Sequence, residues 1–117
     1  HAHAHLRVLG GVKDTAANLQ EAIGGEAYEF ESMYPAFVAE AEKEANKPAL
    51  TSFKYAMAVE KIHHTLYTEA YKAVAAGKDL PARKLFVCPV CGNTVYDHAP
   101  DKCPICGVAK DKFVEIA

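Results

Sequence analysis

The sequence lacks an excess of positive charge, a long apolar run and an initial methionine. Its 117 residues include 13 Lys and Arg against 15 Asp and Glu, so no basic field favours nucleic acid or an anionic membrane surface. No apolar run approaches the roughly 18 residues that span a bilayer. The N-terminus also lacks the charged start, apolar centre and cleavage site of a secretory signal. We therefore expect a cytoplasmic protein that binds neither nucleic acid nor membranes.

Half of the residues are hydrophobic, which is enough for one compact domain or for a small domain beside a metal-stapled unit. The sequence opens with the run HAHAH, which places His1 and His5 on one face of a helix. Gly10 and Gly11 then favour the end of that helix. We interpret residues 1–12 as the end of a truncated helix and a loop, with a purification-tag remnant as the alternative for the histidines.

A helical hairpin is predicted for residues 13–77. Apolar residues recur at steps of three and four along its first half, which is the period of one helix face, and Asp14 or Thr15 can cap the first turn. Pro35 lies inside this stretch. Because proline lacks a backbone N–H and clashes with the carbonyl four residues earlier, we expect a local kink or bulge there.

The second helix of the hairpin is expected to start at Pro48, after a short turn at residues 45–47. Proline suits the first helical position because its missing N–H would be unpaired there, and Gly77 favours the end of the helix. Two helices joined by so short a turn pack antiparallel. Residues 78–83 are then predicted to form a linker.

Residues 84–117 form a separate unit that carries two C-P-x-C-G motifs. In each motif the two thiolates can reach one metal ion, while glycine permits the turn that directs backbone N–H groups toward sulfur. Two such motifs form a tetrahedral S4 site, which suits zinc or a single iron. Disulfides are the alternative for a pattern of this kind. The four cysteines are Cys88, Cys91, Cys103 and Cys106.

Carboxylates interrupt the apolar stripe of each helix in the hairpin. Glu26 does so in the first helix, and Glu60 and His63 do so in the second, in the spacing Glu-x-x-His. Burying a carboxylate costs several kcal/mol unless it is paired or bound to metal, so these positions indicate ligands. Glu29, one turn after Glu26, can reach the same interior. The alternative is an ordinary exposed glutamate on each helix.

The cysteine unit resembles rubredoxin, whose C-P-x-C-G motifs surround a small aromatic core that Phe86, Tyr96 and Phe113 can supply here. Tyr96 stands one place from the usual tyrosine and the insert between the motifs is short, so a zinc ribbon remains the alternative. If iron is bound, the unit transfers one electron at a time, with a potential tuned by hydrogen bonds to sulfur and by exposure.

The whole chain resembles the rubrerythrin family. The resemblance rests on the Glu and Glu-x-x-His hairpin, on the segment from Gly25 through Tyr28 and Met33 to Pro35, and on the rubredoxin-like unit that follows. It implies a mainly α fold with a small metal-bound β module, in which a partial ferritin-like four-helix bundle precedes a rubredoxin-like domain. Residues 1–12 would then end a truncated bundle helix.

The resemblance implies a non-haem di-iron peroxidase that reduces hydrogen peroxide to water. Glu26, Glu60, His63 and His1 would bind iron, Glu29 would be an additional carboxylate whose iron exchanges with a histidine, and Tyr34 would lie beside the irons. The four cysteines would hold a mononuclear iron that relays electrons from a donor such as a reductase or a rubredoxin. It also implies homodimers, or larger assemblies, with head-to-tail or swapped packing.

The chain accounts for only part of the family's helical bundle, which leaves other functions open. The family's first bundle helix and the glutamate of its second have no counterpart in this chain, so we expect the di-iron centre to be completed by residues outside it. We also expect the hairpin to pack against further helices, because large apolar side chains on it would otherwise face water. The alternatives are a rubredoxin-type electron carrier with a helical adaptor and a zinc-ribbon interaction module.

Overall fold

A long helical hairpin and a small β module make up the structure, a computed structural model in which residues 1–116 are described. The helices are α1 (Ala2–Val8), α2 (Thr15–Tyr28), the π-helical segment η1 (Glu29–Met33), α3 (Tyr34–Lys43) and α4 (Lys47–Ala75). The β module contains β1 (Leu85–Val87), β2 (Thr94–Tyr96), the 3-10 turn η2 (Lys110–Lys112) and β3 (Val114–Glu115). The mainly α fold with a small β module, expected from the sequence, is confirmed.

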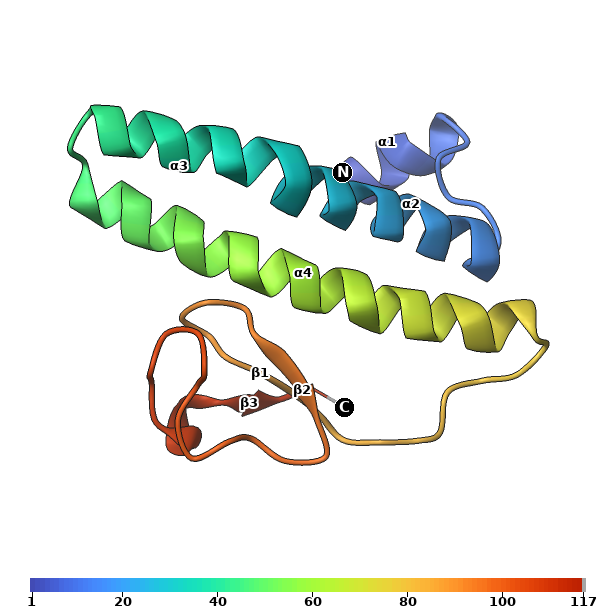
Figure 1. The fold of residues 1–117 in the computed structure, drawn as a ribbon. Coiled ribbons are helices and arrows are strands. Elements are labelled where there is room, and N and C mark those ends of the chain that lie inside the picture. Colours follow the sequence, from blue (N-terminus) through green and yellow to red (C-terminus); the bar gives the residue numbers. More distant parts are fainter. Residues whose placement is uncertain (117) are drawn as a thin grey trace.

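The first arm of the hairpin is one rod of α2, η1 and α3 (Figure 1). Its π-helical segment, Glu29–Met33, ends two residues before Pro35. The wider turn adds a residue to the helix where proline cannot donate a backbone hydrogen bond. The bulge expected at Pro35 is therefore confirmed, just before the proline itself.

Local signals set the ends of the hairpin helices. Asp14 caps α2 by accepting a hydrogen bond from the N–H of Ala17 at 2.8 Å, and Asn46 caps α4 by accepting one from Ala49 at 3.2 Å. Gly77 ends α4 with a φ of 69°, a left-handed conformation that glycine adopts without strain. Pro48 occupies the second helical position, one residue later than expected.

The β module packs against α4 on the side opposite the first arm, so α4 forms the middle layer of the molecule (Figure 1). Its three strands have the order β2-β1-β3, and both pairings are antiparallel. Arg83, at the end of the linker, pairs with Asp97 and lies 4.4 Å from the centre of the Tyr96 ring. These contacts attach the linker to β2.

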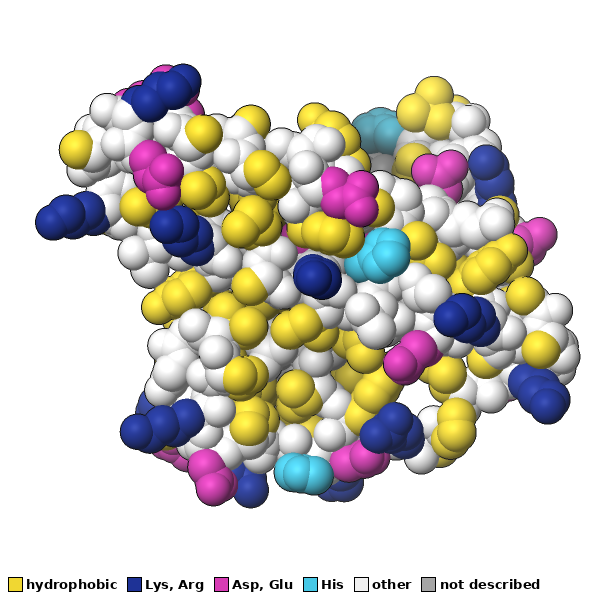
Figure 2. Space-filling model, in the orientation of Figure 1, with side chains coloured by type: hydrophobic (Ala, Val, Ile, Leu, Met, Phe, Trp, Pro, Cys, Tyr) yellow, Lys and Arg dark blue, Asp and Glu magenta, His cyan; other side chains and the backbone are white. Residues whose placement is uncertain are grey.

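Few side chains are fully buried. Val59 of α4 is 1% exposed and lies where α4 meets the β module, whereas Val8 and Phe37 are exposed. Hydrophobic side chains spread over both the hairpin and the module on the face shown in Figure 2. Helix α1 packs against no other element of the described chain. The described helices also include none with the length and hydropathy needed to cross a membrane.

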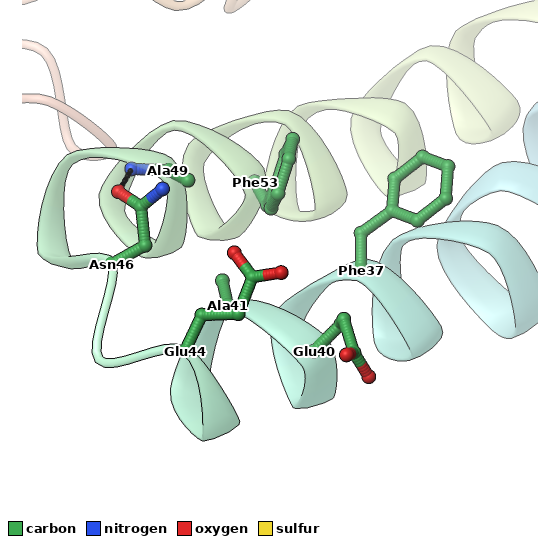
Figure 3. Close-up of a pocket in the computed structure, with 7 residues that line it drawn as sticks. All are labelled: Phe37, Glu40, Ala41, Glu44, Asn46, Ala49 and Phe53. Atoms are coloured by element: carbon green, nitrogen blue, oxygen red, sulfur yellow. Dashed lines mark hydrogen bonds between the residues drawn. The ribbon is translucent and has the colours of Figure 1, made fainter.

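A pocket of about 310 Å³ lies near the turn of the hairpin, between α3 and α4 (Figure 3). The rings of Phe37 and Phe53 both line this pocket, with centroids 5.4 Å apart. Among described residues, its two glutamates, Glu40 and Glu44, have no histidine or cysteine with which to form a metal site. We interpret this pocket as a packing gap in the hairpin.

Replacing Val59 with alanine should lower the free energy of unfolding by about 2 kcal/mol, because the substitution leaves a cavity where α4 meets the β module. Val8→Ala is the matched control, since Val8 is 87% exposed. Denaturant unfolding of both variants measures the difference. Equal stabilities would contradict this assignment of the core.

Candidate metal centres

The four cysteines converge on one point from two similar turns. The Sγ atoms of Cys88 and Cys106 lie 3.5 Å apart, and those of Cys91 and Cys103 lie 3.6 Å apart. A tetrahedral site with metal–sulfur bonds of about 2.3 Å has S–S edges of about 3.8 Å, close to these distances. A disulfide would need about 2.05 Å, and all four cysteines are free. The geometry therefore fits one S4-bound metal, iron included.

Glycine shapes both turns as expected. Gly92 and Gly107 have φ values of 82° and 80°, and each donates its N–H to the carbonyl of the first cysteine in its motif, at 2.8 and 2.9 Å. Burial raises the pKa of the Cys103 thiol, but the backbone N–H groups of Cys106 and Ile105, together with the thiols of Cys91 and Cys106, lower that pKa to about 7. One thiolate is thus available near neutral pH to begin metal binding.

A second cluster forms where α2 faces α4. Glu26, Glu60 and His63 place one ligand atom each within 4.8 Å of one another. His63 Nδ1 lies 2.8 Å from Glu60 Oε2 and 3.7 Å from Glu26 Oε1. The Glu-x-x-His spacing puts Glu60 and His63 one turn apart on the same helix face. The structure therefore brings together these three residues, all of which were candidate ligands in the sequence.

The Glu26 carboxyl group lacks a full set of partners. Its Oε2 atom is buried and has no hydrogen-bond partner. Burial is the main reason why the pKa of Glu26 is raised to about 7. The hydrogen bond with Glu60 and the negative charge of Glu60 raise it further. A buried carboxylate is stabilised either by a proton or by a cation. This unpartnered oxygen fits a metal ligand.

Glu29 and Tyr34 lie beside the cluster, while His1 does not. Glu29 begins the π-helical segment and is half-buried. The pKa of Tyr34 is raised mainly because its side chain is partly buried. The negative charges of Glu60, Glu29 and Glu26 raise it further. His1 is exposed at the start of α1, with its ring 6.4 Å from that of His5.

His63 also contacts the β module, which sequence reasoning did not anticipate. Its Nε2 atom lies 3.1 Å from the carbonyl oxygen of Gly92 and 3.2 Å from Thr94 Oγ1. A carbonyl can only accept, so Nε2 carries the proton and Nδ1 is free to bind a metal. Since Gly92 directly follows Cys91, one histidine connects the two candidate centres within this chain. No local signal in the sequence could have indicated a contact across 29 positions.

Comparison with protein families agrees with both halves of this arrangement. The model described as "Rubrerythrin" matches residues 1–71, and the model described as "Rubrerythrin, rubredoxin-like domain" matches residues 86–114. Together these matches cover α1 to α3, most of α4 and most of the cysteine module.

Characterised proteins show the same similarity. Rubrerythrin-2 of Clostridium acetobutylicum is 45% identical over 96 residues, which cover 82% of this chain and 52% of the relative. Nigerythrin of Nitratidesulfovibrio vulgaris is 38% identical over 96 residues, covering 82% of this chain and 46% of the relative. The chain thus spans about half the length of the relatives it matches.

Solved structures of nigerythrin share the fold. The mixed-valence form superposes with a TM-score of 0.80 at 35% identity, over 89% of this chain and 50% of that one. The fully reduced form, described as all ferrous, gives a TM-score of 0.80 at 34% identity, over 90% of this chain and 50% of that one. The ferritin-like and rubredoxin-like parts expected from the sequence are therefore confirmed.

Glu26→Gln should stabilise the metal-free protein at high pH. The native state keeps a proton on Glu26 up to about pH 7, whereas the unfolded chain releases it near 4.5. The contribution of Glu26 to the free energy of unfolding is therefore fully present below pH 4.5. It is lost as the pH rises from about 4.5 through about 7. Glutamine stays neutral, so at pH about 8 the variant should gain on the order of 2 kcal/mol over the parent.

Chelator-treated protein, unfolded in denaturant at several pH values, measures this gain. Glu21→Gln is the control, because Glu21 lies on the same helix and is exposed. A gain that does not change between pH about 5 and about 8 would contradict the buried, proton-sharing position of Glu26.

Cys103→Ser should remove the red colour of the oxidised iron-loaded protein, because an S4 site needs all four thiolates. Visible spectra and iron analysis after reconstitution measure this. Replacement of the exposed Val90 by alanine, within the first motif, is the control. A parent protein that stays colourless and retains zinc after iron reconstitution would contradict an iron site.

Proposed function

The chain belongs to the rubrerythrin family, and we propose that, within a complete helical bundle, it reduces hydrogen peroxide to water. In this proposal the hairpin provides part of a non-haem di-iron centre, and the cysteine module holds an iron that relays electrons. The chain spans about half of its relatives' length, so the remaining ligands are proposed to come from helices outside it.

One observation carries the proposal: three side chains that could bind a metal meet at a half-buried point beside the cysteine module. Glu26 and Glu60 would lie this close together as carboxylates only if a cation or a proton lay between them. His63 adds a neutral nitrogen to the same point. Two carboxylates and one histidine are the ligands that each half of a ferritin-like di-iron bundle supplies.

The chain's own residues would divide the work as follows. Glu26, Glu60 and His63 would hold the metal, and Glu29 would offer a further carboxylate from the first residue of the π-helical segment. Tyr34, whose raised pKa keeps its phenol protonated at neutral pH, can donate a hydrogen bond or a proton near the carboxylates.

Two ferrous ions held in part by Glu26, Glu60 and His63 would supply the two electrons that peroxide reduction requires, and an iron held by the four thiolates would supply one-electron relay chemistry. The four thiolates leave no open position for substrate, so that site is proposed as a relay only. His63, hydrogen-bonded to Gly92, would hold the two proposed centres next to each other.

The proposed di-iron site needs more ligands than Glu26, Glu29, Glu60 and His63 provide. In the proposed complete bundle, His1 would provide the histidine of a second Glu-x-x-His motif, and α1 would dock against the hairpin. A second copy of this chain, in head-to-tail or swapped packing, or a separate helical pair could provide the other carboxylates. The electron donor is proposed to be a reductase or a rubredoxin, and the location cytoplasmic.

Glu60→Ala and His63→Ala should each lower peroxide turnover about a hundredfold or more, because each removes a ligand from the di-iron centre. The visible spectrum of the cysteine-bound iron should remain, since neither residue is one of its ligands. The assay follows peroxide consumption by the chain assembled with the missing bundle helices, in cis or in trans.

Glu69→Ala is the control for these variants, because Glu69 is exposed on the same helix. Parental turnover in either Glu60→Ala or His63→Ala would show that these residues are not ligands. An assembled protein with one iron per chain and no turnover would instead identify an electron carrier, and a colourless zinc protein would identify a zinc-ribbon module.

A further inference from the structure

Asn93 is the one polar residue that is fully buried in the described part of the chain, with 1% of its surface exposed. It lies between Gly92, which contacts His63, and Thr94, the first residue of β2. A buried amide loses several hydrogen bonds to water, so its presence requires compensating bonds within the protein.

The partners of Asn93 belong to the cysteine site. Its side-chain Nδ2 donates to Cys103 Sγ at 3.7 Å, and its backbone oxygen accepts from the N–H of Cys88 at 2.9 Å. Its backbone N–H also lowers the pKa of the Cys91 thiol, although burial raises that pKa more. Asn93 is thus connected to both cysteine motifs.

The second motif contains an internal comparison. Val108 follows Gly107 as Asn93 follows Gly92, and its carbonyl accepts from the N–H of Cys103 at 2.8 Å. The two backbone positions therefore perform the same structural task. The turn does not need an amide side chain, since valine suffices in the second motif. The amide of Asn93 must therefore act on something other than the turn.

We propose that Asn93 raises the reduction potential of the cysteine-bound iron through the hydrogen bond from its side-chain amide to the Cys103 sulfur. This inference rests on the proposed iron relay. On reduction, one electron enters from an external one-electron donor, ferric iron becomes ferrous, and no bond breaks and no proton moves. The thiolates then carry more negative charge, which an N–H donor stabilises more strongly in the reduced state than in the oxidised state.

Asn93→Val tests this directly, because it gives the first motif the residue found in the second. The iron-loaded variant should retain one S4 iron, and its midpoint potential should become more negative. The expected change in the reduction equilibrium is about tenfold, which corresponds to 59 mV for a one-electron couple. Val108→Ala is the matched control and should leave the potential nearly unchanged, because Val108 has no side-chain donor.

Asn93→Asp is the second variant, since it keeps the side-chain shape but replaces the amide donor with an anion near sulfur. Its potential at pH about 8 should be more negative than that of Asn93→Val, because the anion also repels the reduced thiolates. A parental potential in either iron-loaded variant would overturn the proposal.

Cadmium-substituted parent protein provides a readout that does not depend on any variant. Cadmium-113 bound by the four thiolates should show NMR coupling to the side-chain amide protons of Asn93, through the hydrogen bond to Cys103. Absence of that coupling would overturn the proposal even if the variants fail to load iron. The assembled parent protein could instead show no peroxide turnover while the potential shifts and the cadmium coupling are as expected. That result would count against the proposed function alone.

Discussion

The Glu26 carboxylate, which has one buried oxygen, is the main constraint on the hairpin. It faces Glu60 across the gap between α2 and α4, and one of its oxygens has no partner. Two acidic groups in one low-dielectric space repel each other unless a proton or a cation joins them. The hairpin thus gives up some stability in its metal-free form. In exchange, it holds three candidate ligands close together, an arrangement typical of a functional centre rather than of a structural core.

Helix α4 connects the two centres because it is buried on two sides. One face presents Glu60 and His63 toward α2, and another packs Val59 against the β module near Gly92. His63 belongs to both contacts: Nδ1 faces the carboxylates, and Nε2 faces the turn that follows Cys91. A displacement of the module would therefore also release the hydrogen bond that holds the proton on Nε2 of His63 and leaves Nδ1 unprotonated.

Local signals predicted much of this structure, and long-range contacts escaped prediction. The caps at Asp14, the bulge before Pro35 and the glycine turns of the cysteine motifs depend on neighbouring residues, so composition and spacing were sufficient. Helical periodicity correctly indicated that Glu26 and Glu60 face inward. It could not indicate the contact of His63 with Gly92 or the bond from Asn93 to Cys103, because these depend on how separate units dock. The role of His1 stays a prediction.

The central claim is that a second metal site lies between α2 and α4, beside the cysteine site. A crystal structure of the iron-loaded protein, with anomalous diffraction at the iron edge, tests it most directly. The account predicts one peak among the four cysteines and another within bonding distance of Glu26, Glu60 and His63 Nδ1. A single peak at the cysteines, with these three side chains turned away from one another in the iron-loaded crystal, would contradict the account.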